Sequence, residues 1–197
     1  MKVLVISPHP DDETLCCGGT IINLKKKGYE VRIIIVTDGR YGAPKDELKG
    51  TKELIEIRRK EALRAVKKLG VDDIIFLDFE DSKVNEKNTE IENSIRAILR
   101  DYKPDITFSP IPLDNHPDHA GLGKIMLKLA PSSYFYLIWM PEKLRLEGWD
   151  EIKFDIREYR QLKIEAIMEY KSQLGGFSEE FLKRLTGEYE IFYKRII

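Results

Sequence analysis

The sequence is poor in several features that would otherwise point to a function. No apolar run in the 197 residues approaches the length that spans a bilayer, and the apolar start over residues 1–6 is too short for a signal peptide. The formal net charge of −1 gives no reason to expect nucleic acid or an anionic membrane as a partner. We therefore expect a protein without membrane insertion and without nucleic-acid binding.

Cysteine and glutamine are also scarce. The two cysteines, Cys16 and Cys17, are neighbours that rarely bridge each other, so a disulfide framework is excluded and a cytoplasmic protein is expected. Their thiols suggest a redox or metal role, but small side chains buried in a helix are the simpler interpretation. Glutamine occurs at Gln161 and Gln173 alone, beside many lysines and glutamates, a bias typical of proteins from thermophiles.

The chain does show alternating strand and helix patterns. Hydrophobic residues make up 42% and charged residues 34%, which indicates a soluble globular protein, most simply one domain over residues 1–197. Nearly continuous apolar runs predict buried strands at 2–7, 31–37, 74–79 and 105–109. Amphipathic stretches predict helices at 13–27, 51–69, 89–102 and 120–129. This order predicts an α/β fold with a Rossmann-like, doubly wound, mostly parallel sheet flanked by helices.

The C-terminal part is more irregular. We expect a strand over 133–140, a short strand over 153–156, a helix over 157–173 and an edge strand over 188–196. A polar loop with glycine and proline spans 39–50, after the second predicted strand. Because loops at the carboxyl ends of parallel strands line the ligand crevice of such a sheet, this loop is expected near the site.

All three histidines lie in two short acidic segments, of which residues 8–13 (PHPDDE) are the first. His9 and Asp12 are three positions apart across a strand-to-helix turn, so both can face one centre above the sheet edge. Asp11 must then point elsewhere, beside a metal-bound water. The alternative is that Asp11 or Asp12 caps the helix, but this leaves His9 unexplained. Glu13 is expected to be a favourable charge in the first helical turn or a support behind the site.

The second segment, residues 109–119 (SPIPLDNHPDH), follows the fourth predicted strand and opens a helix. In a parallel sheet this loop emerges on the same side as the first segment. His9, Asp12 and either His116 or His119 would complete a three-ligand metal site with one open position. Together the two segments use every histidine of the chain, so we predict a zinc ion here, with another divalent transition metal as the alternative.

The ligand set itself predicts hydrolysis. Zinc lowers the pKa of a bound water to about 7, and a free carboxylate, Asp11, can accept its proton as general base. The histidine outside the metal site can stabilise the oxyanion as an imidazolium or protonate the leaving amine. Asp118 can orient that histidine and raise its pKa. The set suits amide or ester cleavage through a tetrahedral intermediate.

The two segments resemble the LmbE-like/PIG-L family of zinc-dependent N-acetylglucosaminyl deacetylases. Further matches at 12–28, 37–39, 58–71 and 163–173 extend the resemblance over most of the chain. It implies metal ligands at His9, Asp12 and His119, a general base at Asp11, and His116 as the oxyanion or proton-donor histidine.

The resemblance also implies a small-molecule amino-sugar substrate, a substrate contact at Arg58 and assembly as a homo-oligomer, a trimer or hexamer. A tyrosine assists the oxyanion in some members, and Tyr41, Tyr134 and Tyr136 are candidates here by position. Two alternatives stay open, a metal-dependent amidase that acts on a non-sugar acyl amide and a non-catalytic α/β module that binds a nucleotide or sugar. Such a module would not need Asp11 or His116.

Overall fold

The computed structural model describes residues 1–42, 46–140 and 146–196. A seven-stranded sheet runs through it in the order β3-β2-β1-β4-β5-β7-β6. Five strands are parallel, namely β1 (Lys2–Ser7), β2 (Glu30–Thr37), β3 (Asp73–Phe79), β4 (Ile106–Pro110) and β5 (Tyr134–Tyr136). β7 (Tyr189–Arg195) and β6 (Trp149–Asp155) join antiparallel. The predicted α/β fold with a mostly parallel sheet is confirmed.

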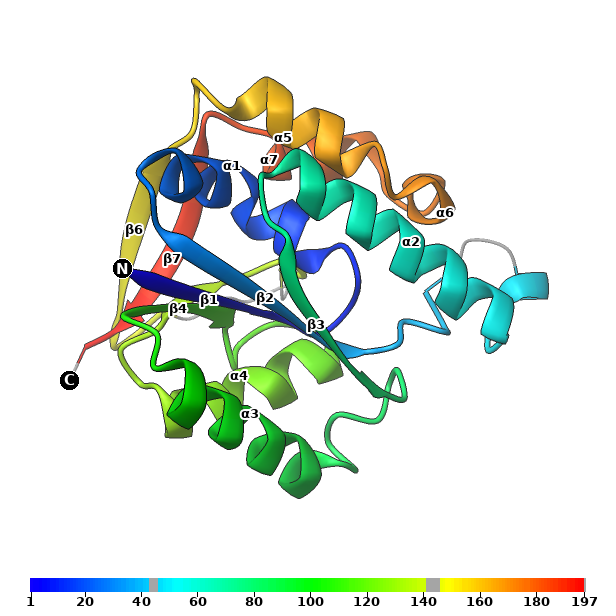
Figure 1. Cartoon of the computed structure of the whole chain (residues 1–197), viewed down its shortest axis with the longest axis horizontal. Coiled ribbons are helices and arrows are strands. Elements are labelled where there is room, and N and C mark those ends of the chain that lie inside the picture. Colours follow the sequence, from blue (N-terminus) through cyan, green and yellow to red (C-terminus); the bar gives the residue numbers. More distant parts are fainter. Residues whose placement is uncertain (43–45, 141–145, 197) are drawn as a thin grey trace.

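Helices cover both faces of this sheet (Figure 1). One face carries α1 (Asp12–Lys26), α2 (Lys52–Lys68), α5 (Arg160–Ile167), α6 (Lys171–Leu174) and α7 (Glu179–Leu185), and the other carries α3 (Asn88–Tyr102) and α4 (Pro117–Leu129). In β1 the alternate residues Val3 and Val5 join the core under the first group, whereas Leu4 and Ile6 join the core under the second. Burial from both sides explains why the strand sequences are almost continuously apolar.

The strand order places a topological switch point between β1 and β4. From β1 the chain adds β2 and β3 on one side, then crosses over to add β4 and β5 on the other. The carboxyl ends of β1 and β4 therefore lie side by side, with Val5 opposite Phe108. Open α/β sheets bind ligands at such a point. Both histidine segments leave the sheet there, as the sequence predicts.

Two strand predictions need correction. The strand expected over 133–140 is β5 alone, because the amides of Ile138 and Trp139 donate to the Asp114 carboxylate at 3.0 and 3.2 Å instead of to a neighbouring strand. The predicted edge strand 188–196 is β7, but it lies inside the sheet, since β6 pairs along its whole length. β6 is correspondingly longer than the expected 153–156.

The prediction of one helix over 157–173 is also wrong, because this segment forms two helices, α5 and α6. Tyr170 leaves helical geometry between them (φ −82°, ψ 55°), and its hydroxyl donates to the buried Glu13 carboxylate. Helix α7 was not expected, although Ser178 caps it through a hydrogen bond from the amide of Phe181. In the described part of the loop 39–50, residues Asp46–Leu48 form the 3-10 turn η1.

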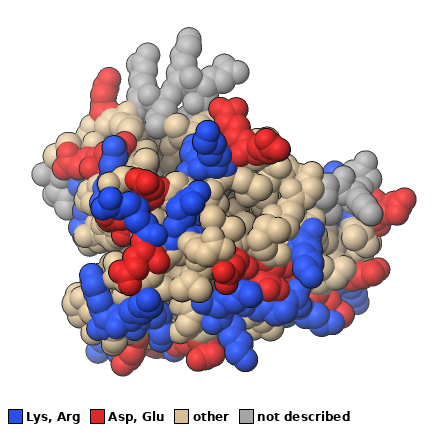
Figure 2. Space-filling view, turned by 90° about the horizontal axis from the view of Figure 1, so that it is seen from above, with Lys and Arg blue, Asp and Glu red and all other residues tan. Residues whose placement is uncertain are grey.

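Charged side chains of both signs are interspersed over the face seen in Figure 2. Many form surface pairs, such as Arg64 with Glu169 at 2.9 Å. Within the described ranges, no helix combines the length and the apolar character that a bilayer span requires.

The buried ion pair between Lys163 and Glu190 ties three elements together. Nζ of Lys163 in α5 lies 2.7 Å from Oε1 of Glu190 in β7, and both side chains are almost fully buried. The Glu190 carboxylate also accepts the amides of Gly19 and Thr20 in the middle of α1, each at 2.8 Å. Because the two charges have left water together, losing either one leaves the other without compensation.

We expect Glu190→Gln to lower the free energy of unfolding by about 3–5 kcal/mol, because it leaves a buried lysine charge unpaired. The matched control is Glu151→Gln, which removes the same charge from a surface pair with Lys153 and should cost far less. Urea denaturation of the two variants measures the difference. Equal losses of unfolding free energy in the two variants would show that the buried ion pair contributes no more to stability than the surface pair.

Candidate functional site

The loop after β1 holds Asp11 in an unfavourable backbone conformation. Its φ is 144°, in the region that favours glycine, although it directly precedes α1. Among the described residues its side chain makes no capping hydrogen bond. Its amide donates to the Glu13 carboxylate at 3.2 Å, so Glu13 supports the loop from behind. Helix capping therefore does not account for Asp11, and the conformation leaves its carboxylate free to face the cavity.

Asp12, the first residue of α1, joins the two histidine segments. Its Oδ2 lies 3.1 Å from Nδ1 of His9 and 3.1 Å from Nε2 of His119. Donor atoms around a tetrahedral zinc ion, each about 2.0–2.2 Å from the metal, lie roughly 3.3 Å apart, close to these separations. His119 is fully buried, yet neither ring nitrogen makes a hydrogen bond of good geometry to a described residue. These three side chains fit a zinc-like ion.

His9 and His119 each have a further carboxylate beside the ring nitrogen that does not face Asp12. Nε2 of His9 lies 3.1 Å from Asp118, and Nδ1 of His119 lies 3.4 Å from Asp114. Metal-binding histidines usually donate their remaining N–H to such a group, which fixes the ring and makes it a better ligand. The Asp118 carboxylate is itself held by the amide of Ser82 at 2.8 Å.

The carboxylates and imidazoles of the site shift one another's pKa towards the charged forms. Burial alone would raise the pKa of Asp12, but His119 and His9 hold it well below its usual range. Burial alone would lower the pKa of His119, but Asp12 and Asp114 raise it to about 9. The same attraction between carboxylate and cationic ring is available to a metal ion, which would replace the protons.

His116 differs from the other two histidines. It is the N-cap of α4, and its Nδ1 accepts the amide of Asp118 at 3.2 Å. A nitrogen that accepts carries no proton, so Nε2 is the protonated nitrogen of a neutral ring. Burial lowers the pKa of His116, and the nearby His9 and His119 lower it further. Asp118 contacts this ring through its backbone amide, while its carboxylate contacts His9. The charge of Asp118 raises the pKa of His116, as expected, but burial and the other two histidines outweigh that effect.

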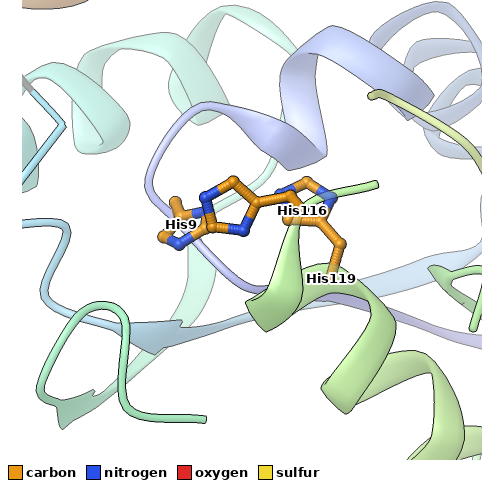
Figure 3. Close-up of side chains that lie close together, drawn as sticks. All are labelled: His9, His116 and His119. Atoms are coloured by element: carbon orange, nitrogen blue, oxygen red, sulfur yellow. The ribbon is translucent and has the colours of Figure 1, made fainter. Parts of the chain in front are cut away.

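The three rings gather between the loop after β1 and the start of α4 (Figure 3). Their centroids lie 4.9 to 5.3 Å apart, and their nitrogens form a potential metal-binding group, as do His9, Asp81 and Asp118. Spacing in the sequence left His116 and His119 as alternatives, and proximity alone still does. His119 has the Asp114 carboxylate beside its Nδ1, as metal-binding histidines usually do, whereas Nδ1 of His116 accepts a backbone amide. This difference favours His119 as the ligand.

Arg58 lies beneath Asp11 and is 2% exposed. One guanidinium nitrogen donates to Asp11 Oδ2 at 2.9 Å and to the carbonyl of Pro10 at 2.7 Å, and the other donates to the carbonyl of Gly39 at 2.8 Å. Burial raises the pKa of Asp11 to about 8, with Arg58 opposing the rise. Arg58 also lines the cavity, so contact with substrate is compatible with its role in holding Asp11.

An open cavity lies over these residues. It brings together most of the predicted site, since its walls are made by His9, Asp11, Asp12, Leu15, Tyr41, Gly42, Arg58, Asp81, Ser82, His116, Trp139, Gln173 and Phe177. Asp81 and Asp114 were not predicted as site residues. Each lies shortly after a parallel strand, a position that indicates the ligand-binding edge of the sheet. Oδ1 of Asp81 lies 3.2 Å from Nε2 of His9, and its carboxylate accepts the amide of Tyr41.

Other candidates separate clearly by position. Of the three tyrosines, Tyr41 lines the cavity, whereas Tyr134 stacks on Phe108 and the Tyr136 hydroxyl donates to a β1 carbonyl. Cys16 and Cys17 are buried in the core beside α5, and burial raises the pKa of both thiols. This agrees with packing as their role.

Comparison with known proteins identifies one family. The PIG-L family model, described as GlcNAc-PI de-N-acetylase, matches residues 4–130, more than half of the chain. The diacetylchitobiose deacetylase of Thermococcus kodakarensis is 38% identical over 125 residues, which are 62% of this chain but 46% of that protein. The probable N-acetyl-alpha-D-glucosaminyl L-malate deacetylase 2 of Bacillus anthracis is 31% identical over 199 residues, 95% of this chain and 86% of that protein.

Solved structures agree. The N,N'-diacetylchitobiose deacetylase from Pyrococcus horikoshii, in complex with its inhibitor MPG, superposes with a TM-score of 0.75 at 29% identity, covering 93% of this chain and 73% of that one. The zinc-inhibited form of the teicoplanin deacetylase Orf2 gives a TM-score of 0.81 at 19% identity, covering 98% and 97%. The second comparison shows a shared fold alone.

We expect Asp118→Asn to weaken zinc affinity about 10- to 100-fold, because His9 loses the carboxylate that orients it. Asp101→Asn, the same change at an exposed residue of α3, is the control and should leave affinity unchanged. Competition with a chromophoric chelator measures both. Equal affinity of the two variants would remove Asp118 from the support of the metal site.

Proposed function

Since the chain belongs to the PIG-L family, we propose that it is a zinc-dependent N-deacetylase, which hydrolyses the N-acetyl amide of an N-acetylglucosamine-type sugar or conjugate and releases acetate and a free amine. The names of two relatives, one acting on diacetylchitobiose and one on a malate glycoside, support this substrate class. The observation that carries the proposal is Asp11, a buried carboxylate in strained backbone, free of capping, beside His9, Asp12 and His119.

His9, Asp12 and His119 would hold the zinc ion through Nδ1, a carboxylate oxygen and Nε2. When bound, zinc supplies Lewis-acid polarisation of a carbonyl and a water nucleophile of lowered pKa. Asp118 and Asp114 keep the two rings in place, so the chain's own residues fix the ligand geometry before any substrate enters.

Asp11 is the general base of the proposed reaction. Burial raises its pKa to about 8, so the carboxylate can hold a proton taken from water and later pass it to the departing amine. Arg58 limits that rise and fixes the carboxylate against the cavity wall. The strained backbone at Asp11 is consistent with a side chain held in place for chemistry.

His116 stabilises the oxyanion as a neutral hydrogen-bond donor. Its Nδ1 is engaged by the Asp118 amide, which leaves the Nε2 proton for the cavity. Donors placed before the reaction stabilise the charge that develops on the amide oxygen without the cost of reorganisation. The lowered pKa of His116 favours this role over that of an imidazolium.

The lining of the cavity fits a sugar. Asp81, Gln173 and Arg58 offer hydrogen-bonding groups of the kind that sugar hydroxyls need, while Leu15 and Trp139 add apolar surface. A non-catalytic binding module would have no use for a strained Asp11.

Metal analysis and acetate release test the proposal together. Purified protein should contain or recruit one zinc ion and release acetate from at least one member of a panel of N-acetylglucosamine, N,N'-diacetylchitobiose, and inositol- and malate-linked N-acetylglucosamine. Chelation should abolish release, and added zinc should restore it. A metal-loaded protein that releases acetate from none of these compounds would contradict the proposal.

We expect Asp11→Asn to lower kcat about 10²- to 10⁴-fold while metal content is retained, because the side chain keeps its shape but loses the base. Asp101→Asn is the control for the loss of one carboxylate. Unchanged turnover in a metal-loaded Asp11→Asn protein would show that another group is the base.

Two substitutions at His116 separate catalysis from helix capping. His116→Ala should lose both the donor and the N-cap, with kcat falling about 10²- to 10³-fold and stability falling by about 0.5–2 kcal/mol. His116→Asn should restore the cap, since asparagine accepts the same amide, yet leave kcat low. If asparagine restores turnover as well, the ring has no part in the reaction.

A further inference from the structure

Three aromatic side chains form a stacked row at the mouth of the cavity, which we call the aromatic ladder. Trp139 stacks on Phe181 with ring centroids 4.8 Å apart and planes 23° apart, and Phe181 stacks on Phe177 at 5.0 Å and 27°. Trp139 is 37% exposed, so part of its ring faces solvent. The ladder therefore presents aromatic surface to solvent beside the site.

The ladder belongs to the same cavity as the metal centre. Trp139 and Phe177 line it together with His9, Asp12 and His116. These two residues come from segments well apart in the sequence, one following β5 and the other preceding α7. A substrate whose N-acetyl group reaches His9 and Asp12 would extend towards the ladder as it leaves the cavity.

The ladder is held rigidly at its distance from the metal centre. The Asp114 carboxylate accepts the Trp139 amide at 3.2 Å and lies 3.4 Å from Nδ1 of His119, so one carboxylate positions both. Arg184 of α7 donates to the carbonyl of Ile138, and its guanidinium lies 5.5 Å from the ring centre of Phe181. A platform fixed in this way binds without having to be ordered first.

The charge of the cavity wall selects the kind of group that can bind. Among the described lining residues, Asp11, Asp12 and Asp81 are acidic, and the one cationic side chain, Arg58, is already engaged with Asp11. Beside the ladder, the cation Arg184 is engaged with the carbonyl of Ile138 and the ring of Phe181. A carboxylate-bearing substituent on the sugar would therefore find no unengaged cation among these described residues. An uncharged ring, whose C–H faces are apolar, matches exposed aromatic faces.

We propose that the aromatic ladder is a binding subsite for a second, uncharged pyranose ring linked to the N-acetylated sugar. The substrate class is then a neutral amino-sugar oligosaccharide, in preference to a monosaccharide or a malate conjugate. This inference rests on the proposed deacetylase function, and its tests are arranged so that the two can fail separately.

Binding to the ladder can be observed through tryptophan fluorescence. The chain has two tryptophans, so Trp149→Phe leaves Trp139 as the single reporter, and Asp11→Asn in the same chain suppresses turnover. With zinc bound, N,N'-diacetylchitobiose should change the Trp139 emission at concentrations at least tenfold below those that N-acetylglucosamine requires. Equal responses to the two sugars, or no response to the disaccharide, would overturn the subsite.

Kinetics give an independent measure. The ratio of kcat/KM for N,N'-diacetylchitobiose to that for N-acetylglucosamine should fall at least tenfold in Trp139→Ala and recover largely in Trp139→Tyr, which restores an aromatic face. Tyr189→Ala removes an exposed aromatic ring outside the cavity lining and is the matched control. A ratio unaffected by Trp139→Ala, or a wild-type preference for the malate conjugate, would overturn the proposal.

The outcomes distinguish the two claims. Acetate release from the disaccharide without any dependence on Trp139 retains the deacetylase and removes the subsite. A change in Trp139 fluorescence on adding the disaccharide, without acetate release by the wild-type protein, retains the subsite and removes the proposed reaction. Retained thermal stability and zinc content in each variant show that the protein has folded.

Discussion

The parallel pairing of β1 with β4 is the constraint on which the site depends. The register sets Val3 opposite Ile106 and Val5 opposite Phe108, so the two strands end at the same edge of the sheet. The loops that leave this edge carry all three histidines, although His9 lies more than a hundred residues from the other two in the chain. Helices bury β1 on both faces, so the core holds the pairing of β1 with β4 in place. The loops that carry the site are therefore anchored to a rigid part of the sheet.

Electrostatics support His9, Asp12 and His119 as the proposed metal ligands. Asp12 lies between His9 and His119, and each ring is held from behind by a further carboxylate. So many acidic groups can be buried together only where cationic charge compensates them, whether from protonated rings or from a metal ion. His116 stands outside this arrangement because a backbone amide, not a carboxylate, lies behind it. The same four-residue segment thus contains one proposed metal ligand, His119, and one proposed hydrogen-bond donor, His116.

Asp114 links the fold to the outer part of the cavity. By accepting the amides of Ile138 and Trp139, it ends β5 early and turns the chain away from the sheet. That turn places Trp139 against Phe181 at the mouth of the cavity, while the same carboxylate lies beside His119. A strand that continued to residue 140, as the apolar run predicts, would leave the cavity without this wall. The irregularity is therefore what shapes the binding surface.

The α/β class, the first four strands of the parallel sheet and the convergence of His9, Asp11, Asp12, His116 and His119 could be predicted from the sequence, because strand periodicity and motif position are local properties of the chain. The sequence did not determine the roles of Asp81 and Asp114, the partner of Asp118, the break at Tyr170 or the place of β7 inside the sheet. Each of these depends on a contact between residues distant in sequence, such as Tyr170 with Glu13 or Asp118 with His9. Local patterns carry no record of such contacts, and only the tertiary structure decided them.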